Sequence, residues 1–185
     1  MVAKDQTKEL ATEVPFVCRP LNLATFKSEH PDIKYAWINE ASDFARSMYG
    51  TISYTNELLN EVNAVRQVLD ETPGATQDMI KEAERINNEL DSIKYRFNGP
   101  EPKASEEELP PMKMPLVQRL STIASASYGT SGDITTIARD QLDILKIDFP
   151  PILERVKKVG QDLLNLNKQL DMIKAPWTPG RVPVL

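Results

Sequence analysis

Residue types that chemical sites usually need are scarce in this 185-residue sequence. Its single cysteine, Cys18, excludes an intrachain disulfide and any metal site built from several cysteines. A nucleophilic Cys18 would need the single histidine, His30, as its partner, and the sequence supplies no third group to orient such a pair. Cys18 follows an apolar stretch, so we expect a buried and inert thiol. The sequence therefore predicts no catalytic residue, no cofactor site and no metal ligand.

Other scarcities exclude whole classes of protein. Seven glycines and 6% aromatic residues are few for an all-β fold with many tight turns. The net charge is −5, and the densest basic group, Arg155 with Lys157 and Lys158, is typical of a solvated helix face, so we expect no nucleic-acid partner. No apolar run is long enough to span a membrane. Residues 1–13 are polar and charged, unlike a signal peptide.

What the sequence does contain is helical periodicity. A first helix is expected from Pro31 to the Thr72-Pro73-Gly74 breaker, with Gly50 weakening it. Steps of three and four, with one extra residue near Ile52, predict its core stripe. That stripe is Trp37, Ala41, Phe44, Met48, Ile52, Thr55, Leu59, Val62, Val65/Arg66 and Leu69.

The second helix should start after the N-cap Thr76 and end at residues 98–100. Its inward positions are Met79, Ala83, Ile86, Leu90, Ile93 and Phe97. Residues 98–114, rich in proline and glutamate, read as a surface loop. A short helix follows at 115–127, with Leu116, Leu120, Ile123 and Ala124 inward, and Ser131 is expected to cap the next helix.

The last helix, expected over residues 133–174, has the clearest pattern. An unbroken heptad-like seam runs through Leu142, Leu145, Phe149, Ile152, Val156, Val159, Leu163, Leu166, Leu170 and Ile173, with Ala138 extending it backwards. Pro150 and Pro151 lie inside it, so we expect a kink there, or a restarted helix capped by Asp148. A seam of this kind fits pairing within one chain or between two copies, which leaves a homo-oligomeric scaffold open.

The predicted fold is therefore all-α: an elongated up-and-down bundle of three to four helices with long first and last members. Residues 1–24 form a flexible or extended lead-in, residues 25–185 form the bundle domain, and an extended tail follows the last helix.

Three stretches resemble a known family. Residues 14–25, with Pro15-Phe16-Val17-Cys18-Arg19-Pro20, residues 71–75, and the tail at 175–183, with Pro176-Trp177-Thr178-Pro179-Gly180-Arg181, carry the resemblance. They are similar to the C-terminal helical region of large secreted bacterial proteins with sortilin-type or sialidase-type β-propellers. These proteins are often named glycosyl hydrolases with Asp-box (BNR) repeats.

The resemblance implies a secreted or periplasmic location and a propeller that precedes this region. In the family a strand corresponding to residues 14–18 closes a small β-segment. This chain has no Asp-box pattern, so glycosidase chemistry would belong to the propeller. The family's segment before the last helix is replaced here by a different sequence at residues 128–133.

Three functions follow as hypotheses. The first is a non-catalytic domain that docks on the propeller of its parent protein or on another extracellular protein. Its candidate contact residues are Phe16, Leu21, Leu23, Trp177 and Arg181, with Trp177 expected to dock the tail onto the bundle. The second is part of a glycoside hydrolase, and the third is the homo-oligomeric scaffold.

Overall fold

The computed structural model describes residues 4–5, 8–9, 14–18, 26–100, 112–128 and 131–183. Its helices are α1 (Pro31–Glu71), α2 (Gln77–Asn98), α3 (Leu116–Tyr128) and α4 (Thr136–Met172). Two short strands, β1 (Lys4–Asp5) and β2 (Lys8–Glu9), pair antiparallel in the N-terminal lead-in. The prediction of an all-α up-and-down bundle with long first and last helices is confirmed.

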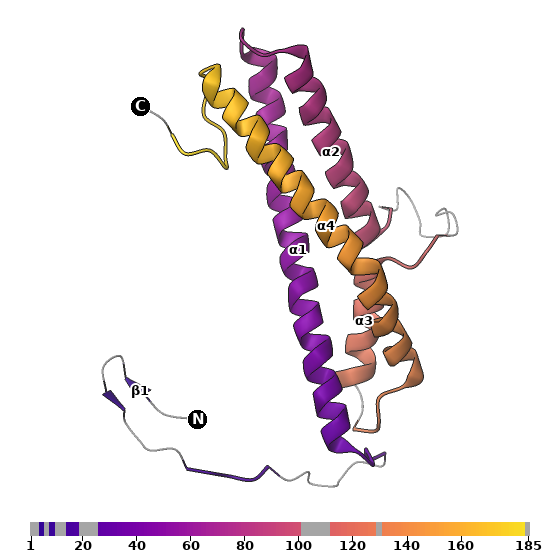
Figure 1. The fold of residues 1–185 in the computed structure, drawn as a ribbon. Coiled ribbons are helices and arrows are strands. Elements are labelled where there is room, and N and C mark those ends of the chain that lie inside the picture. Colours follow the sequence, from indigo (N-terminus) through magenta and orange to yellow (C-terminus); the bar gives the residue numbers. More distant parts are fainter. Residues whose placement is uncertain are drawn as a thin grey trace.

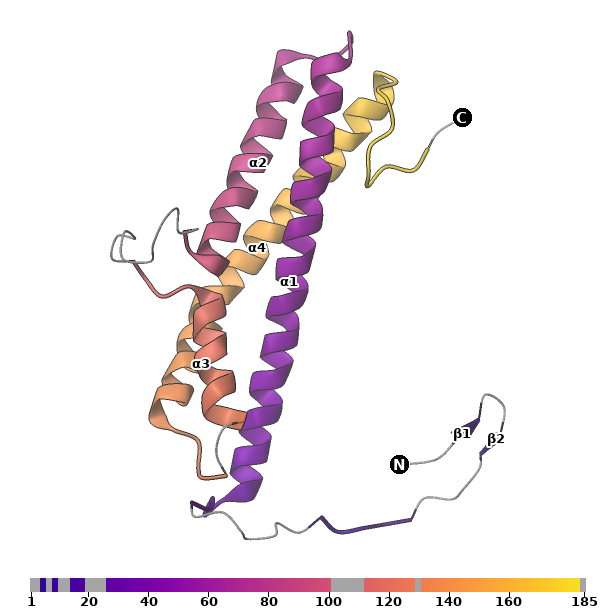
Figure 2. The ribbon, with the colours of Figure 1, turned by 180° about the vertical axis from the view of Figure 1, so that it is seen from behind.

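The helices form an elongated bundle, and α1 runs along its length (Figure 1). Helices α2 and α3 follow one another along α1, and α4 runs obliquely across the bundle (Figure 1). The view from behind shows α1 in front, with α4 behind it (Figure 2). Phe149 of α4 contacts two other helices: its ring centroid lies 5.4 Å from that of Phe44 on α1 and 6.4 Å from that of Phe97 on α2. The core is thus shared by one chain's own helices.

The buried face of α1 differs from the core stripe that the sequence predicted. Thr51 and Leu58 are buried, whereas Ile52 and Leu59, which the sequence pattern placed inward, are only half-buried. The buried positions are Ala41, Met48, Thr51, Thr55, Leu58, Val62, Val65 and Leu69, so the period continues without an extra residue. The pattern was misleading because Thr51 is polar. Its hydroxyl donates to the carbonyl of Ser47 at 2.9 Å, which offsets the cost of burial.

Helix α2 follows its sequence closely. The hydroxyl of Thr76 accepts a hydrogen bond from the backbone N–H of Met79 at 3.3 Å, as expected of an N-cap. Gly99 ends the helix with φ +78°, a left-handed conformation that glycine adopts without a Cβ clash. All six predicted inward positions are buried.

The α3–α4 connection differs from the prediction in two respects. Ala124 is exposed, and Ser127 takes the next inward position, donating its hydroxyl to the carbonyl of Ile123 at 2.6 Å. Ser131 is not the cap of α4. That role belongs to Thr135, whose hydroxyl accepts from the N–H of Ala138 at 3.2 Å.

Helix α4 is continuous through Pro150 and Pro151, so the restart capped by Asp148 was a wrong alternative. Both prolines are exposed, and the buried residues Phe149 and Ile152 flank them. The predicted seam is buried from Ala138 to Leu170, while Ile173 is half-buried against the core. The prolines remove two helical N–H donors on the solvent side, where water can satisfy the freed carbonyls.

Charged side chains join α2 to α4 outside the core. Arg85 contacts Glu82 at 2.7 Å and Asp162 at 2.5 Å, and Arg155 contacts Glu89 at 2.7 Å. The hydrogen bond from Arg155 lowers the pKa of Glu89, and that from Arg85 lowers the pKa of Glu82. Arg155 of the densest basic group is thus engaged within the bundle.

Candidate interaction surfaces

The N-terminal apolar segment, residues 14–18, lies away from the helices in extended backbone (Figure 1). Phe16 is 75% exposed, and Val14 and Val17 are exposed as well. Cys18 is also exposed, so the expectation of a buried thiol was wrong. The error came from the apolar neighbours of Cys18, which are themselves uncovered. Leu21 and Leu23, two of the candidate contact residues, lie outside the described residues.

The base of the bundle anchors the chain that follows this segment. Ser131 donates its hydroxyl to the carbonyl of Phe26 at 2.8 Å, and the ammonium of Lys34 donates to the carbonyl of Gly132 at 2.7 Å. Ser28 donates to the carboxylate of Asp133, and this bond is the main cause that lowers the pKa of Asp133. Residues 131–133 therefore hold residues 26–28 at this end of the bundle, a role that the sequence did not reveal.

At the other end, the C-terminal strap (residues 175–183) folds back onto the bundle. Ala175 and Thr178 are buried, and the backbone of Gly180 lies close against the carboxylate of Glu61 on α1. Trp177, which we expected to dock the strap, is instead 58% exposed. Its indole N–H donates to the carbonyl of Arg181 at 2.7 Å. The buried residues of the strap near the indole are the smaller Ala175 and Thr178.

Arg181 connects the strap to the end of α4 and to other residues of the strap. Its side chain is only 6% exposed and contacts the carboxylate of Asp171 at 2.6 Å. The guanidinium also donates to the carbonyl of Pro176 at 2.6 Å and that of Ala175 at 3.2 Å. A guanidinium saturated in this way is structural rather than a free contact residue. Sequence reasoning missed Asp171 as its partner.

A pocket of about 460 Å³ opens beside the strap. It is lined by Asp171, Lys174, Ala175, Trp177, Arg181, Val182 and Pro183. Its walls combine exposed apolar side chains with Lys174 and with the paired Asp171 and Arg181, a mixture of apolar and polar groups suited to binding another polypeptide.

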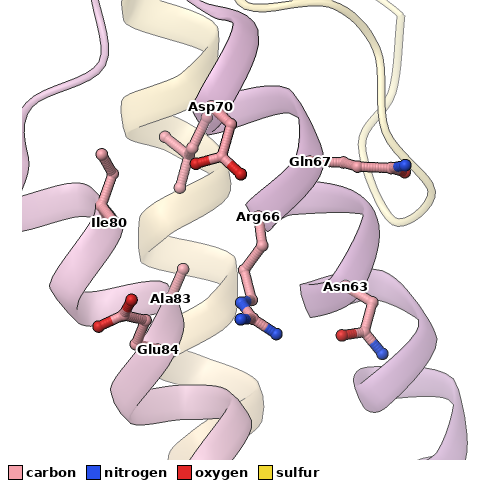
Figure 3. A pocket seen from close by; sticks show the side chains of 8 residues that line it. Asn63, Arg66, Gln67, Asp70, Ile80, Ala83 and Glu84 are labelled. Atoms are coloured by element: carbon pink, nitrogen blue, oxygen red, sulfur yellow. The ribbon is translucent and has the colours of Figure 1, made fainter.

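A second, more polar pocket lies in the seam between α1 and α2, with a volume of about 260 Å³. Figure 3 shows Arg66 and Asn63 reaching in from α1, with Ile80, Ala83 and Glu84 on α2. Asp70 and Glu84 supply two carboxylates, but both side chains are exposed, as is Arg66. A solvated groove of this kind gives no dry environment for acid–base chemistry.

The residues that sequence reasoning weighed as chemical groups are not brought together. His30 is exposed at the N-cap position of α1, and Cys18 lies in the uncovered segment. Among the described residues, no group of three or more His, Cys, Asp or Glu side chains is placed to hold a metal ion. None of the helices in the described ranges combines the length and apolar character needed to cross a bilayer.

Comparison of the chain with models of protein families, with curated proteins and with solved structures found no match.

Proposed function

We propose that this chain is a non-catalytic helical module that docks onto a larger exported β-propeller protein, or onto another extracellular protein. The observation that carries the proposal is the N-terminal apolar segment. Its apolar side chains are exposed although the bundle beside it has a complete core. Uncovered apolar side chains gathered in one segment are typical of a binding surface.

The conformation of the segment favours a particular mode of docking. Residues 14–18 are extended, and they make no backbone hydrogen bond to other described residues. Such a segment can add as a strand to the exposed edge of a partner's sheet, because its free backbone groups match those of the edge. Phe16 then supplies the aromatic anchor. The resemblance to propeller proteins supports a sheet-containing partner.

The homo-oligomeric alternative is less favoured. Its seam, from Leu142 to Leu170, is already buried by the chain's own helices, so these seam residues are not exposed to a second copy. Glycosidase chemistry, the other alternative, is assigned in this proposal to the propeller and not to the bundle.

The test uses the polypeptide encoded immediately upstream of this chain, expressed separately and titrated with the chain by calorimetry. We expect a β-propeller protein that binds saturably, with Phe16→Ser weakening binding by about tenfold or more. Tyr49→Ser is the matched control, because Tyr49 is an exposed aromatic residue on α1. An upstream polypeptide without a propeller, or binding that Phe16→Ser leaves unchanged, would overturn the docking proposal.

The non-catalytic half of the proposal has its own test. The isolated chain, assayed with fluorogenic glycosides of several sugars, should give no turnover above a heat-denatured sample. Turnover that is lost on replacing Glu84 or Asp70 would instead identify the α1–α2 groove as an active site.

A further inference from the structure

The strap pocket has one wall of apolar side chains. Trp177 and Val182 are both exposed, and Pro183 lies beside them, while the buried Ala175 also belongs to the lining. Exposed tryptophan and valine in a concave site provide contact area for a bulky apolar side chain. Trp177 keeps its orientation because its indole N–H is bonded to the carbonyl of Arg181.

The charge of the pocket is positive. Among the described lining residues, the one carboxylate, Asp171, is already paired with the buried Arg181. Lys174 is exposed and makes no ion pair with any other described residue. Lys168 is exposed three positions before Asp171 on α4, so it lies on the pocket's side of the helix. The chain as a whole is acidic, with a net charge of −5, so this basic site is a local exception.

Lys174 marks the turn between α4 and the strap. Lys174 has φ +53°, and it ends α4 with its N–H bonded to the carbonyl of Asp171 while Ala175 bonds to Leu170. Glycine is the favoured residue at this position of a helix end. Lys174 therefore lies where α4 ends and the strap begins, beside the pocket that it lines.

We propose that the strap pocket binds an acidic segment of a partner protein that carries one bulky apolar side chain. The apolar side chain packs against Trp177 and Val182, and the flanking carboxylates pair with Lys174 and Lys168. This site is separate from the N-terminal apolar segment, which leaves the opposite end of α1 (Figure 1). The module would then contact partners at two places.

The probe is a synthetic peptide with a central leucine flanked by two glutamates on each side. The indole N–H resonance of Trp177, distinguished from that of Trp37 by Trp177→Phe, reports binding in a proton–nitrogen NMR titration. We expect a saturable shift that weakens with added salt. Lys174→Glu should weaken binding by about fivefold or more, and Val182→Ser should weaken it as well. Lys81→Glu, the same change on the exposed face of α2, should leave binding unchanged.

Several outcomes would overturn the proposal. They are the absence of a saturable shift, equal binding of a peptide with serine in place of leucine, and equal effects of Lys174→Glu and Lys81→Glu. Binding of vesicles containing phosphatidylserine, with no binding of the peptide, would assign the surface to a membrane instead. Thermal unfolding of each variant shows whether the fold is kept. Because Lys174 and Val182 are exposed, both variants should unfold at the wild-type temperature.

Discussion

Arg181 illustrates how one residue can order a segment that has little secondary structure. Three groups accept from its guanidinium: the carboxylate of Asp171 and the carbonyls of Ala175 and Pro176. Burying a guanidinium is costly unless it is paired and its N–H groups are satisfied. Asp171 at the end of α4 supplies the paired charge, and the strap carbonyls of Ala175 and Pro176 accept further N–H groups. These bonds stabilise both the buried guanidinium and the fold of the strap.

Arg181→Ala should therefore destabilise the protein by about 1–3 kcal/mol, through loss of charged hydrogen bonds. Urea unfolding measures the free energy, and hydrogen exchange should show faster exchange in residues 175–183. Arg46→Ala is the control, since Arg46 forms a salt bridge with Asp43 in which both side chains are largely exposed. It should cost less than about 1 kcal/mol. Equal losses in the free energy of unfolding for the two variants would refute the role given to Arg181.

Two glycines with opposite surroundings give a second prediction at this scale. Gly180 has φ +84°, and an added Cβ would lie against the carboxylate of Glu61. Gly180→Ala should cost about 1–2 kcal/mol. Gly50 lies within α1 with no atom near the added Cβ, so Gly50→Ala should stabilise the protein by about 0.5–1 kcal/mol. The midpoint temperatures of thermal unfolding should shift in opposite directions for the two variants. Shifts of the same sign would contradict this prediction.

At the scale of the element, α4 is stabilised by its buried seam. Leu163 is 1% exposed, whereas its neighbour Leu164 is 47% exposed on the outer side of the same helix. Leu163→Ala should cost about 2–5 kcal/mol because it leaves a cavity, and Leu164→Ala less than about 1 kcal/mol. Chemical denaturation of the pair tests which face of α4 is packed. The reverse order would mean that the helix is rotated from the position described.

The ion pairs between α2 and α4 predict a dependence on pH. Arg155 lowers the pKa of Glu89 below its usual value of 4.5 in the folded protein. The pair therefore contributes its full stability at pH values well above 4.5, the pKa of the unfolded carboxyl, and this contribution is lost as the pH falls from there through the lower folded pKa. As the pH is lowered, the free energy of unfolding measured with urea should fall less for the Glu89→Gln variant than for the wild type. An identical pH profile would show that the pair contributes nothing.

The elements also show what a sequence can predict. Regular apolar spacing located α2 and the seam of α4, because helical burial depends on positions close in sequence. The stripe of α1 was misplaced at Thr51, where a backbone hydrogen bond makes a polar residue suitable for burial. The contact of Arg181 with Asp171 and that of Gly180 with Glu61 depend on how the strap folds back. Local periodicity carries no information about such contacts.

At the scale of the whole molecule, the described helices share one buried core, and two surfaces outside it are the proposed binding places. One is the N-terminal apolar segment, whose apolar side chains are exposed. The other is the pocket beside the strap. This arrangement agrees with the proposal of a module that serves a larger assembly without chemistry of its own. The proposal requires that the helical seam is not itself the interface.

Light scattering coupled to size-exclusion chromatography tests that requirement most directly. At tens of micromolar the full chain should have the mass of one copy, 20.8 kDa, because the seam of α4 is already buried by α1, α2 and α3. A stable particle of twice that mass or more would contradict the account. It would mean that the bundle is completed between copies, as in the scaffold alternative.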